Sequence, residues 1–131
     1  MLQCILLTPE KPVCQQQAEF VALPLQDGEI GIAPKHTPLV GRVGCGELRI
    51  RAREGTRRFY VEGGFVEVVG DVVSVLADRA VPAEQIDAAV AAEQLQQARR
   101  RPARTAEEFA RRDHLAAVAR AQLRVARRLA R

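Results

Sequence analysis

The chain has 131 residues and a net charge of +4, and its hydrophobic content of 47% includes one Tyr, four Phe and no Trp. This length allows one ordinary domain or a small domain with an appendage, with a core built mainly of Val, Leu, Ile and Ala. No stretch approaches the roughly 20 apolar residues of a membrane-spanning helix, so we expect a soluble or peripheral protein.

Short apolar stretches separated by turn residues fill positions 1–81. Residues 47–53 alternate with period two, which places Leu48 and Ile50 on one face of a strand. Turn residues recur at short intervals, as at Asp27-Gly28 and Gly70-Asp71, and this spacing predicts a β-sandwich or barrel. The predicted strands cover residues 2–7, 19–25, 28–32, 47–53, 58–61, 65–69 and 72–77.

The pattern becomes helical from Pro82 onward, where glycine is absent and alanine is abundant. We expect a first helix to begin between Pro82 and Gln85 and to end before Pro102, which cannot continue the helical hydrogen bonds. Its apolar stripe comprises Ala88, Ala91, Ala92, Leu95 and Ala98. Thr105 and Glu108 form a capping box for a second helix. The apolar face of that helix comprises Leu115, Val118, Ala119, Gln122, Val125, Ala126 and Leu129.

Two helices joined by a short break predict an antiparallel hairpin, which divides the chain into domains at residues 1–81 and 82–131. The first domain holds nine basic and ten acidic residues, whereas the second holds eleven arginines and six acidic residues. Much of the second helix is covered by Arg111, Arg112, Arg120, Arg124, Arg127 and Arg128. This surface is either a solvated helical face or a site for an acidic protein, a nucleic acid or an anionic membrane.

The polar residues give little support to catalysis or metal binding. His36 lies between prolines and His114 lies on a charged helix, and no motif links either one to a nucleophile. Cys4, Cys14 and Cys45 lack the spacing of a zinc site, so we expect small buried thiols in a reducing compartment. The glycines do not form a phosphate-binding loop that opens a helix. We therefore expect no catalytic residue, no metal and no cofactor.

One stretch points to a family. Residues 27–39 read DGEIGIAPKHTPL and closely resemble the D-G-E-x-G-I-x-P-x-H-x-P-L signature of the ε subunit of F-type ATP synthases. Further agreement lies at Thr8-Pro9-Glu10 and at residues 46–50, 63–68 and 75–78. The resemblance implies an α+β fold, with an N-terminal antiparallel β-sandwich followed by a C-terminal antiparallel two-helix hairpin. The signature residues, which the resemblance implies at a γ or c-ring interface, are Asp27, Gly28, Glu29, Gly31, Pro34, His36 and Pro38.

The resemblance implies a non-catalytic rotor subunit of a bacterial proton-translocating ATP synthase, peripheral to the cytoplasmic face of the plasma membrane. The sandwich would bind the γ subunit and rest on the ring of c subunits. The hairpin would either fold against the sandwich or extend along γ toward the catalytic head, where it would inhibit ATP hydrolysis. There the six arginines of the second helix would meet an acidic loop of the catalytic β subunits.

One departure from the family pattern and one alternative assignment both concern ligands of the hairpin. Family members that bind ATP resemble I/L-D-x-x-R-A at the first helix, whereas this chain has Ile86, Asp87 and, in place of the arginine, Val90. Val81 stands where an earlier acidic residue aligns, so we expect weak or absent ATP binding. The alternative assignment is a stand-alone basic adaptor that binds nucleic acid through the arginine-rich helices. Phe109 is the hairpin's one aromatic residue, so this segment has no platform for stacking bases.

Overall fold

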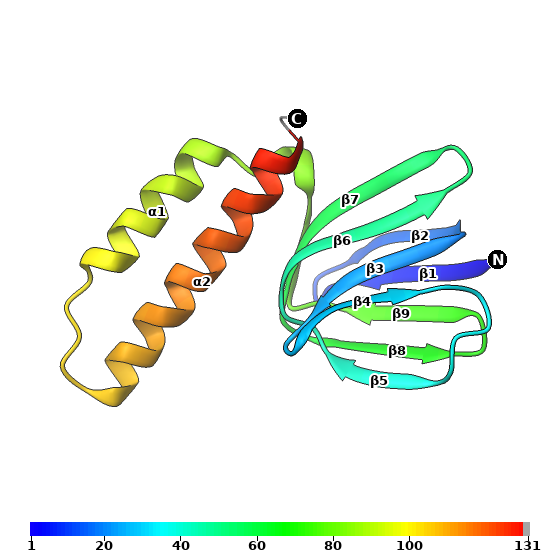
Figure 1. Ribbon diagram of the computed structural model, residues 1–131, viewed down its shortest axis with the longest axis horizontal. Helices are drawn as coiled ribbons and strands as arrows, with labels where there is room; N and C mark the ends of the chain where they lie inside the picture. The colour runs from blue at the N-terminus through cyan, green and yellow to red at the C-terminus, as the bar shows by residue number, and fades with distance from the viewer. Residues whose placement is uncertain (130–131) are drawn as a thin grey trace. The chain divides into compact units, whose positions relative to one another are not determined.

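The computed structural model describes residues 1–129, with side chains through Arg128, and divides into two compact units. The first unit, Met1–Pro82, holds all ten strands, and the second, Ala83–Arg131, holds the helices (Figure 1). Each unit has its own hydrophobic core.

The first unit is a β-sandwich of two five-stranded sheets, as the sequence predicted. One sheet has the order β2-β1-β9-β8-β5 and the other β10-β7-β6-β3-β4. Neighbouring strands are antiparallel except β1 and β9, which are parallel. The strands are β1 (Leu2–Leu7), β2 (Pro12–Ala18), β3 (Phe20–Leu25), β4 (Gly28–Ile32), β5 (Leu39–Arg42), β6 (Cys45–Ala52), β7 (Gly55–Glu62), β8 (Phe65–Val69), β9 (Val72–Leu76) and β10 (Arg79–Pro82).

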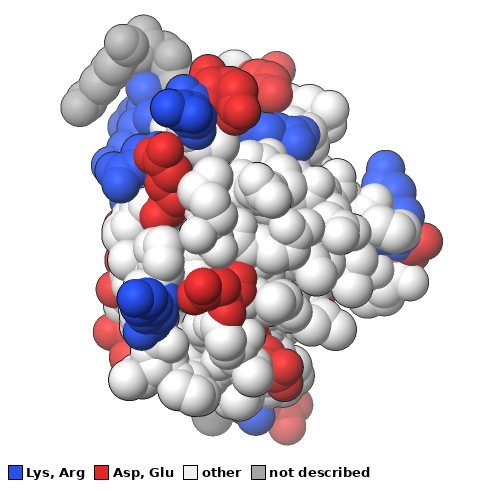
Figure 2. All heavy atoms as spheres, turned by 90° about the vertical axis from the view of Figure 1, so that its right-hand side faces the viewer, with Lys and Arg blue, Asp and Glu red and all other residues white. Residues whose placement is uncertain are grey.

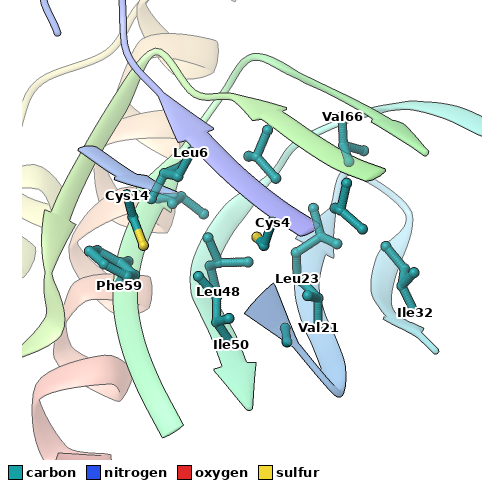
Figure 3. Close-up of a cluster of buried hydrophobic side chains, with 14 of the residues drawn as sticks. Cys4, Leu6, Cys14, Val21, Leu23, Ile32, Leu48, Ile50, Phe59 and Val66 are labelled. Atoms are coloured by element: carbon teal, nitrogen blue, oxygen red, sulfur yellow. The ribbon is translucent and has the colours of Figure 1, made fainter. Parts of the chain in front are cut away.

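Alternation of side chains along the strands builds the sandwich core between the two sheets (Figure 3). Leu48 and Ile50 of β6 are fully buried, as their alternation predicted, and they face residues such as Cys4 and Leu6 of β1. Burial raises the pKa of the Cys4 thiol to about 12. Cys4 is therefore a small apolar core residue, which matches the expectation from the sequence.

Three connections carry the chain from one sheet to the other at a single place, which we call the crossover corner (residues 43–44, 63–64 and 77–78). The first two are joined by main-chain hydrogen bonds, from Val43 N–H to the Gly64 carbonyl at 3.0 Å and from Gly63 N–H to the Gly44 carbonyl at 3.2 Å. A Cβ on Gly64 would overlap the Leu76 carbonyl, and Gly64 has a φ of 95°. Only glycine therefore fits at this position.

Three strands were not predicted from the sequence: β2, β5 and β10. β2 reads PVCQQQA and lacks apolar alternation, although it pairs with β1 along its length. β5 is a four-residue strand at the edge of its sheet, and β10 is a four-residue strand at the edge of the other. Pairing with a neighbouring strand stabilises these segments, and that pairing is not visible in local sequence.

The first helix begins later than expected. Pro82 still pairs with Phe59 in the sheet, and a 3₁₀ turn, η1 (Ala83–Gln85), precedes α1 (Ala88–Arg100). The Asp87 carboxylate caps α1 by accepting N–H bonds from Ala89 at 2.9 Å and Val90 at 3.2 Å. The predicted start between Pro82 and Gln85 was therefore wrong, because the stronger capping residue lies at Asp87.

The second helix, α2 (Ala106–Leu129), starts at the predicted cap. The Thr105 hydroxyl accepts the Glu108 N–H at 3.1 Å, while the Glu108 carboxylate accepts the Arg104 N–H, one residue earlier than in an ordinary capping box. The helices run antiparallel (Figure 1). Their shared core comprises Ala91, Leu95, Ala98, Ala116, Ala119 and Leu123, with Ala92 and Leu115 partly buried.

This packing corrects part of the predicted apolar stripes. Ala88 is exposed at the first position of α1, whereas Ala116 and Leu123 of α2 are buried and were not assigned to the apolar face. The side chain of Leu129 lies outside the described residues. Alanine supplies four of the six buried residues of this core, so the helices approach closely but bury little area per residue.

We predict that Gly64→Ala lowers the free energy of unfolding of the full chain by more than about 2 kcal/mol, because the methyl group overlaps the Leu76 carbonyl and φ is positive. Denaturant titration measures the change. Gly41→Ala is the control, since its Cβ would make only an ordinary contact, 3.4 Å from a Leu25 methyl carbon. Equal losses in the two variants would contradict the prediction.

Candidate functional site

The signature segment is divided between the two ends of β4. Asp27 lies in the turn before the strand, whereas Pro34, His36 and Pro38 follow it. A five-residue strand separates these groups by about 17 Å. The signature therefore cannot present all seven residues as one loop, and we name residues 33–38 the proline loop.

The two signature glycines have local structural roles. Gly28 follows the β3–β4 turn with a φ of 133°, a conformation that L side chains rarely adopt. A Cβ on Gly31 would stand 2.5 Å from a ring carbon of Phe20, a residue of the neighbouring strand β3. Both glycines thus shape the sandwich itself.

Glu29, the acidic residue of the signature, is engaged within the sandwich. Its carboxylate pairs with Arg49 at 2.7 Å, and Arg49 also contacts Glu47, which is 6% exposed and pairs with Arg58 at 3.1 Å. The hydrogen bond to Glu29 is the largest of the effects that raise the pKa of Arg49. Glu29 therefore belongs to an ion-pair network across the β4-β3-β6-β7 side of the sheet.

The proline loop has a fixed main-chain shape. Lys35 has a φ of 66° and is the one non-glycine residue with a positive φ in the described part of the chain. Its N–H donates to the Asp71 carboxylate at 2.8 Å, and the His36 ring Nδ1 lies 2.6 Å from the Thr37 carbonyl. Lys35 and Asp71 were not identified from the sequence as site residues.

A second feature that sequence reasoning missed is an apolar surface on the outside of the β2-β1-β9-β8-β5 sheet. We call it the outer apolar face (Val40, Phe65, Val69, Val72 and Leu76), and every member is at least 41% exposed. Phe65 pairs with Leu76 and Val69 with Val72, so these residues share one side of the β8–β9 hairpin. Val66, Val68, Val73 and Val75 fill the core on the other side.

The end of the sandwich that bears the proline loop and the β8–β9 turn has few charges. Figure 1 places these two segments at the same end, and Figure 2 views the molecule from that side. Uncharged residues occupy most of the visible surface, and acidic and basic side chains lie mainly toward its margin (Figure 2). The surface is therefore suited to contact with another protein.

The arginines of α2 form a more ordered pattern than the sequence suggested. Arg120, Arg124, Arg127 and Arg128 lie within about 100° of helical rotation, and all are exposed. We call them the basic stripe. Arg111 lies on a different side of α2, and the Arg112 guanidinium stacks on Phe109, 4.8 Å from the ring centre. That contact engages the hairpin's one aromatic ring, although Phe109 remains 43% exposed.

The described residues contain no group of three His, Cys, Asp or Glu residues that could hold a metal ion. His36 and His114 lie in different units, on the proline loop and on α2. Within residues 1–129, no helix has the length and apolarity needed to cross a membrane.

Comparisons with known proteins agree with these features. Residues 1–83 match the family of the ATP synthase delta/epsilon chain, β-sandwich domain. The ATP synthase epsilon chain of Rhodopirellula baltica is 40% identical over 126 residues, covering 96% of this chain and 98% of that protein. An epsilon chain from Desulfitobacterium hafniense is 42% identical over 81 residues, covering 62% of this chain and 61% of the relative.

Solved structures share the fold. A chain from the mitochondrial ATP synthase of Euglena gracilis, in a structure of OSCP, F1 and c-ring, gives a TM-score of 0.83 at 21% identity, covering 91% of this chain and 77% of that one. A chain from a structure of the central stalk and c-ring of the Tetrahymena thermophila mitochondrial ATP synthase gives a TM-score of 0.75 at 14% identity. The match covers 95% of this chain and 96% of that one.

A β-sandwich followed by two helices, together with similarity to an epsilon chain over nearly the whole length, defines a non-catalytic subunit of ATP synthase. The chain belongs to the ATP synthase epsilon-chain family.

We predict that the isolated chain does not bind ATP with micromolar affinity. Val90 is 51% exposed but supplies no cation for a triphosphate, and the Asp87 carboxylate is occupied in capping α1. Calorimetric titration of the full chain with MgATP tests this, with Val90→Arg as the comparison that restores the cation. A micromolar dissociation constant for the unmodified chain would contradict the prediction.

Proposed function

We propose that this chain is the ε-type subunit of an ATP synthase central stalk, which connects the γ subunit to the c ring and restrains ATP hydrolysis through its helical hairpin. The observation that carries the proposal is the 40% identity to an ATP synthase epsilon chain over 96% of the chain, because that alignment includes the hairpin as well as the sandwich. A bacterial enzyme would hold the subunit at the cytoplasmic face of the plasma membrane.

The outer apolar face is the surface that we assign to γ. The inward sides of β8 and β9 are wholly apolar, and their outward sides are apolar at both ends of each strand, with Glu67 and Ser74 paired between them. The inner side fills the sandwich core, and the outer side exposes large side chains such as Phe65 at 54% and Val40 at 73%. A stable protein interface would bury such a patch.

The proline loop is the surface that we assign to the c ring. It lies at an end of the sandwich with few charged side chains, and two prolines and the Asp71 contact limit its conformations. A rigid, weakly charged end loses little conformational entropy on docking and carries a small desolvation cost. Those properties suit a permanent contact within a rotor.

The hairpin is the part that we assign to inhibition. Its alanine-rich core has little apolar area for its length, so the energy that favours one arrangement over another is small enough to be changed by a partner. The basic stripe offers four cations on one side of α2, over about two turns, to the acidic loop of a catalytic β subunit. Exposed ion pairs contribute about 0.2–1 kcal/mol each, so several must act together.

We predict that the Phe65→Ser/Leu76→Ser double variant weakens binding to γ at least about tenfold, because the two facing side chains contribute apolar area to the interface. Titration of the full chain into a purified α3β3γ complex measures the affinity. Thr56→Ser, on the other sheet, is the control, and circular dichroism verifies the fold of each variant. Unchanged affinity in the double variant would exclude this face as the γ-binding surface.

We predict that replacing Arg111, Arg112, Arg120, Arg124, Arg127 and Arg128 by Gln relieves inhibition of ATP hydrolysis. The loss of cations removes several cooperating ion pairs, and added salt should relieve inhibition by the unmodified chain in the same direction. Hydrolysis is measured in the reconstituted complex.

Replacing only the basic stripe separates the roles of the arginines. If Arg120, Arg124, Arg127 and Arg128 carry the contact, the fourfold variant should reproduce most of the effect, and Arg111→Gln/Arg112→Gln should have little. The Arg51→Gln/Arg53→Gln variant of the sandwich is the control for loss of charge. Full inhibition by the sixfold variant would exclude the electrostatic account.

A further inference from the structure

The conformation of Lys35 needs an explanation, because a left-handed main chain is unfavourable for a residue with a side chain. Glycine or asparagine would be the ordinary choice at a φ of 66°. Lys35 lies in the middle of the proline loop, between Pro34 and His36. Some contact outside the loop must therefore favour this conformation over the common right-handed one.

That contact comes from the β8–β9 turn. The Asp71 carboxylate accepts the Lys35 main-chain N–H at 2.8 Å, and the two residues are 36 positions apart in the sequence. Such a bond is charge-assisted, which makes it stronger than a neutral one. It engages the main chain of Lys35, so its effect is on loop conformation and is independent of the lysine ammonium group.

Asp71 is itself held firmly. Its main-chain carbonyl accepts the Gln3 N–H at 2.7 Å, which ties the turn to the start of β1. Val69 and Val72 pair on either side of the turn, and Gly70 has a φ of 59°, as the first position of a tight hairpin turn requires. The carboxylate thus projects from a rigid base, and it can impose a conformation on the loop.

The position of His36 depends on the residue before it. With Nδ1 at 2.6 Å from the Thr37 carbonyl, the ring is held by its own loop, and the neutral tautomer that donates there leaves Nε2 as an acceptor. A change of φ at Lys35 would move His36 together with that local bond. The loop conformation therefore decides where this ring nitrogen lies.

We propose that Asp71 is a positioning residue for docking: its carboxylate holds Lys35 in the left-handed conformation and so fixes the proline loop and His36 in the shape that the partner recognises. This inference rests on the proposed function, in which the proline loop contacts the c ring. Asp71 acts through Lys35 and need not touch the partner. The β8–β9 turn then serves both proposed docking surfaces, since its strands also carry the outer apolar face.

The first measurement concerns the loop alone. In the full chain, Asp71→Ala should speed amide hydrogen exchange at Lys35 at least tenfold relative to the unmodified protein, as followed by NMR. Asp71→Asn keeps an acceptor oxygen and should stay close to the unmodified rate. Glu54→Ala, an exposed turn carboxylate of the β6–β7 hairpin, is the matched control. Unchanged exchange in Asp71→Ala would overturn the proposal at its first step.

The second measurement concerns docking. Membranes that contain the c ring and γ, stripped of the ε subunit, are titrated with each variant, and Asp71→Ala should bind at least tenfold more weakly. The Asp71→Ala/Lys35→Gly double variant should regain much of that loss, because glycine adopts a positive φ without an acceptor. If Asp71 mattered only for the structure of the β8–β9 hairpin, a change at Lys35 would not restore binding.

The outcomes separate this inference from the proposed function. If the unmodified chain fails to bind the stripped membranes, the proposed function is wrong. If it binds, but Asp71→Ala accelerates exchange without weakening binding, the positioning role is wrong while the central-stalk assignment stands. Weaker binding that Lys35→Gly does not rescue would also overturn the positioning role.

Discussion

The crossover corner is the constraint on which the rest of the sandwich depends. Three connections pass between the sheets there. The bonds of Val43 and Gly63 join the first two, and the Asp78 N–H donates to the Gly63 carbonyl at 3.4 Å to join the third. Because β8 starts immediately after Gly64, the corner sets which residues of that strand face inward. A shift of one residue would exchange the buried valines for the outer apolar face. The proposed γ-binding surface is therefore a consequence of how closely the sheets approach at this corner.

The same corner explains why the signature segment has two roles. Its first part lies in the β3–β4 turn, where the Gln26 N–H bonds to the Arg42 carbonyl at 3.0 Å and the neighbouring Leu25 bridges to Val43. Its last part forms the proline loop at the other end of β4 (Figure 1). Residues next to the corner are constrained by the fold, whereas the loop is constrained by its own prolines and one distant carboxylate. A continuous motif in sequence thus combines a folding element with a candidate docking element.

The sequence predicted the sandwich and the hairpin because alternation and helical periodicity are local properties. It did not predict β2, whose glutamines pair with β1, or the start of α1, where Asp87 competes with Pro82 for the boundary. The candidate site was predicted only in part. The glycine and proline positions were visible, but the Lys35–Asp71 bond joins distant residues and depends on a main-chain angle. The outer apolar face was not predicted. The alternation along β8 and β9 predicts strands, but it does not tell which side of each strand the rest of the protein covers.

The two units differ in the chemistry of their cores, and this difference bears on their proposed roles. The sandwich core is built from residues such as Leu48, Ile50 and Phe59, each of which contributes about 1.5–3 kcal/mol when buried. The hairpin core is mainly alanine, whose single methyl contributes about 0.8 kcal/mol. A docking surface must keep its shape while its partner turns, and a brake must change its arrangement at small energetic cost. We infer that the large-residue core suits the sandwich to the first task, and that the alanine core suits the hairpin to the second.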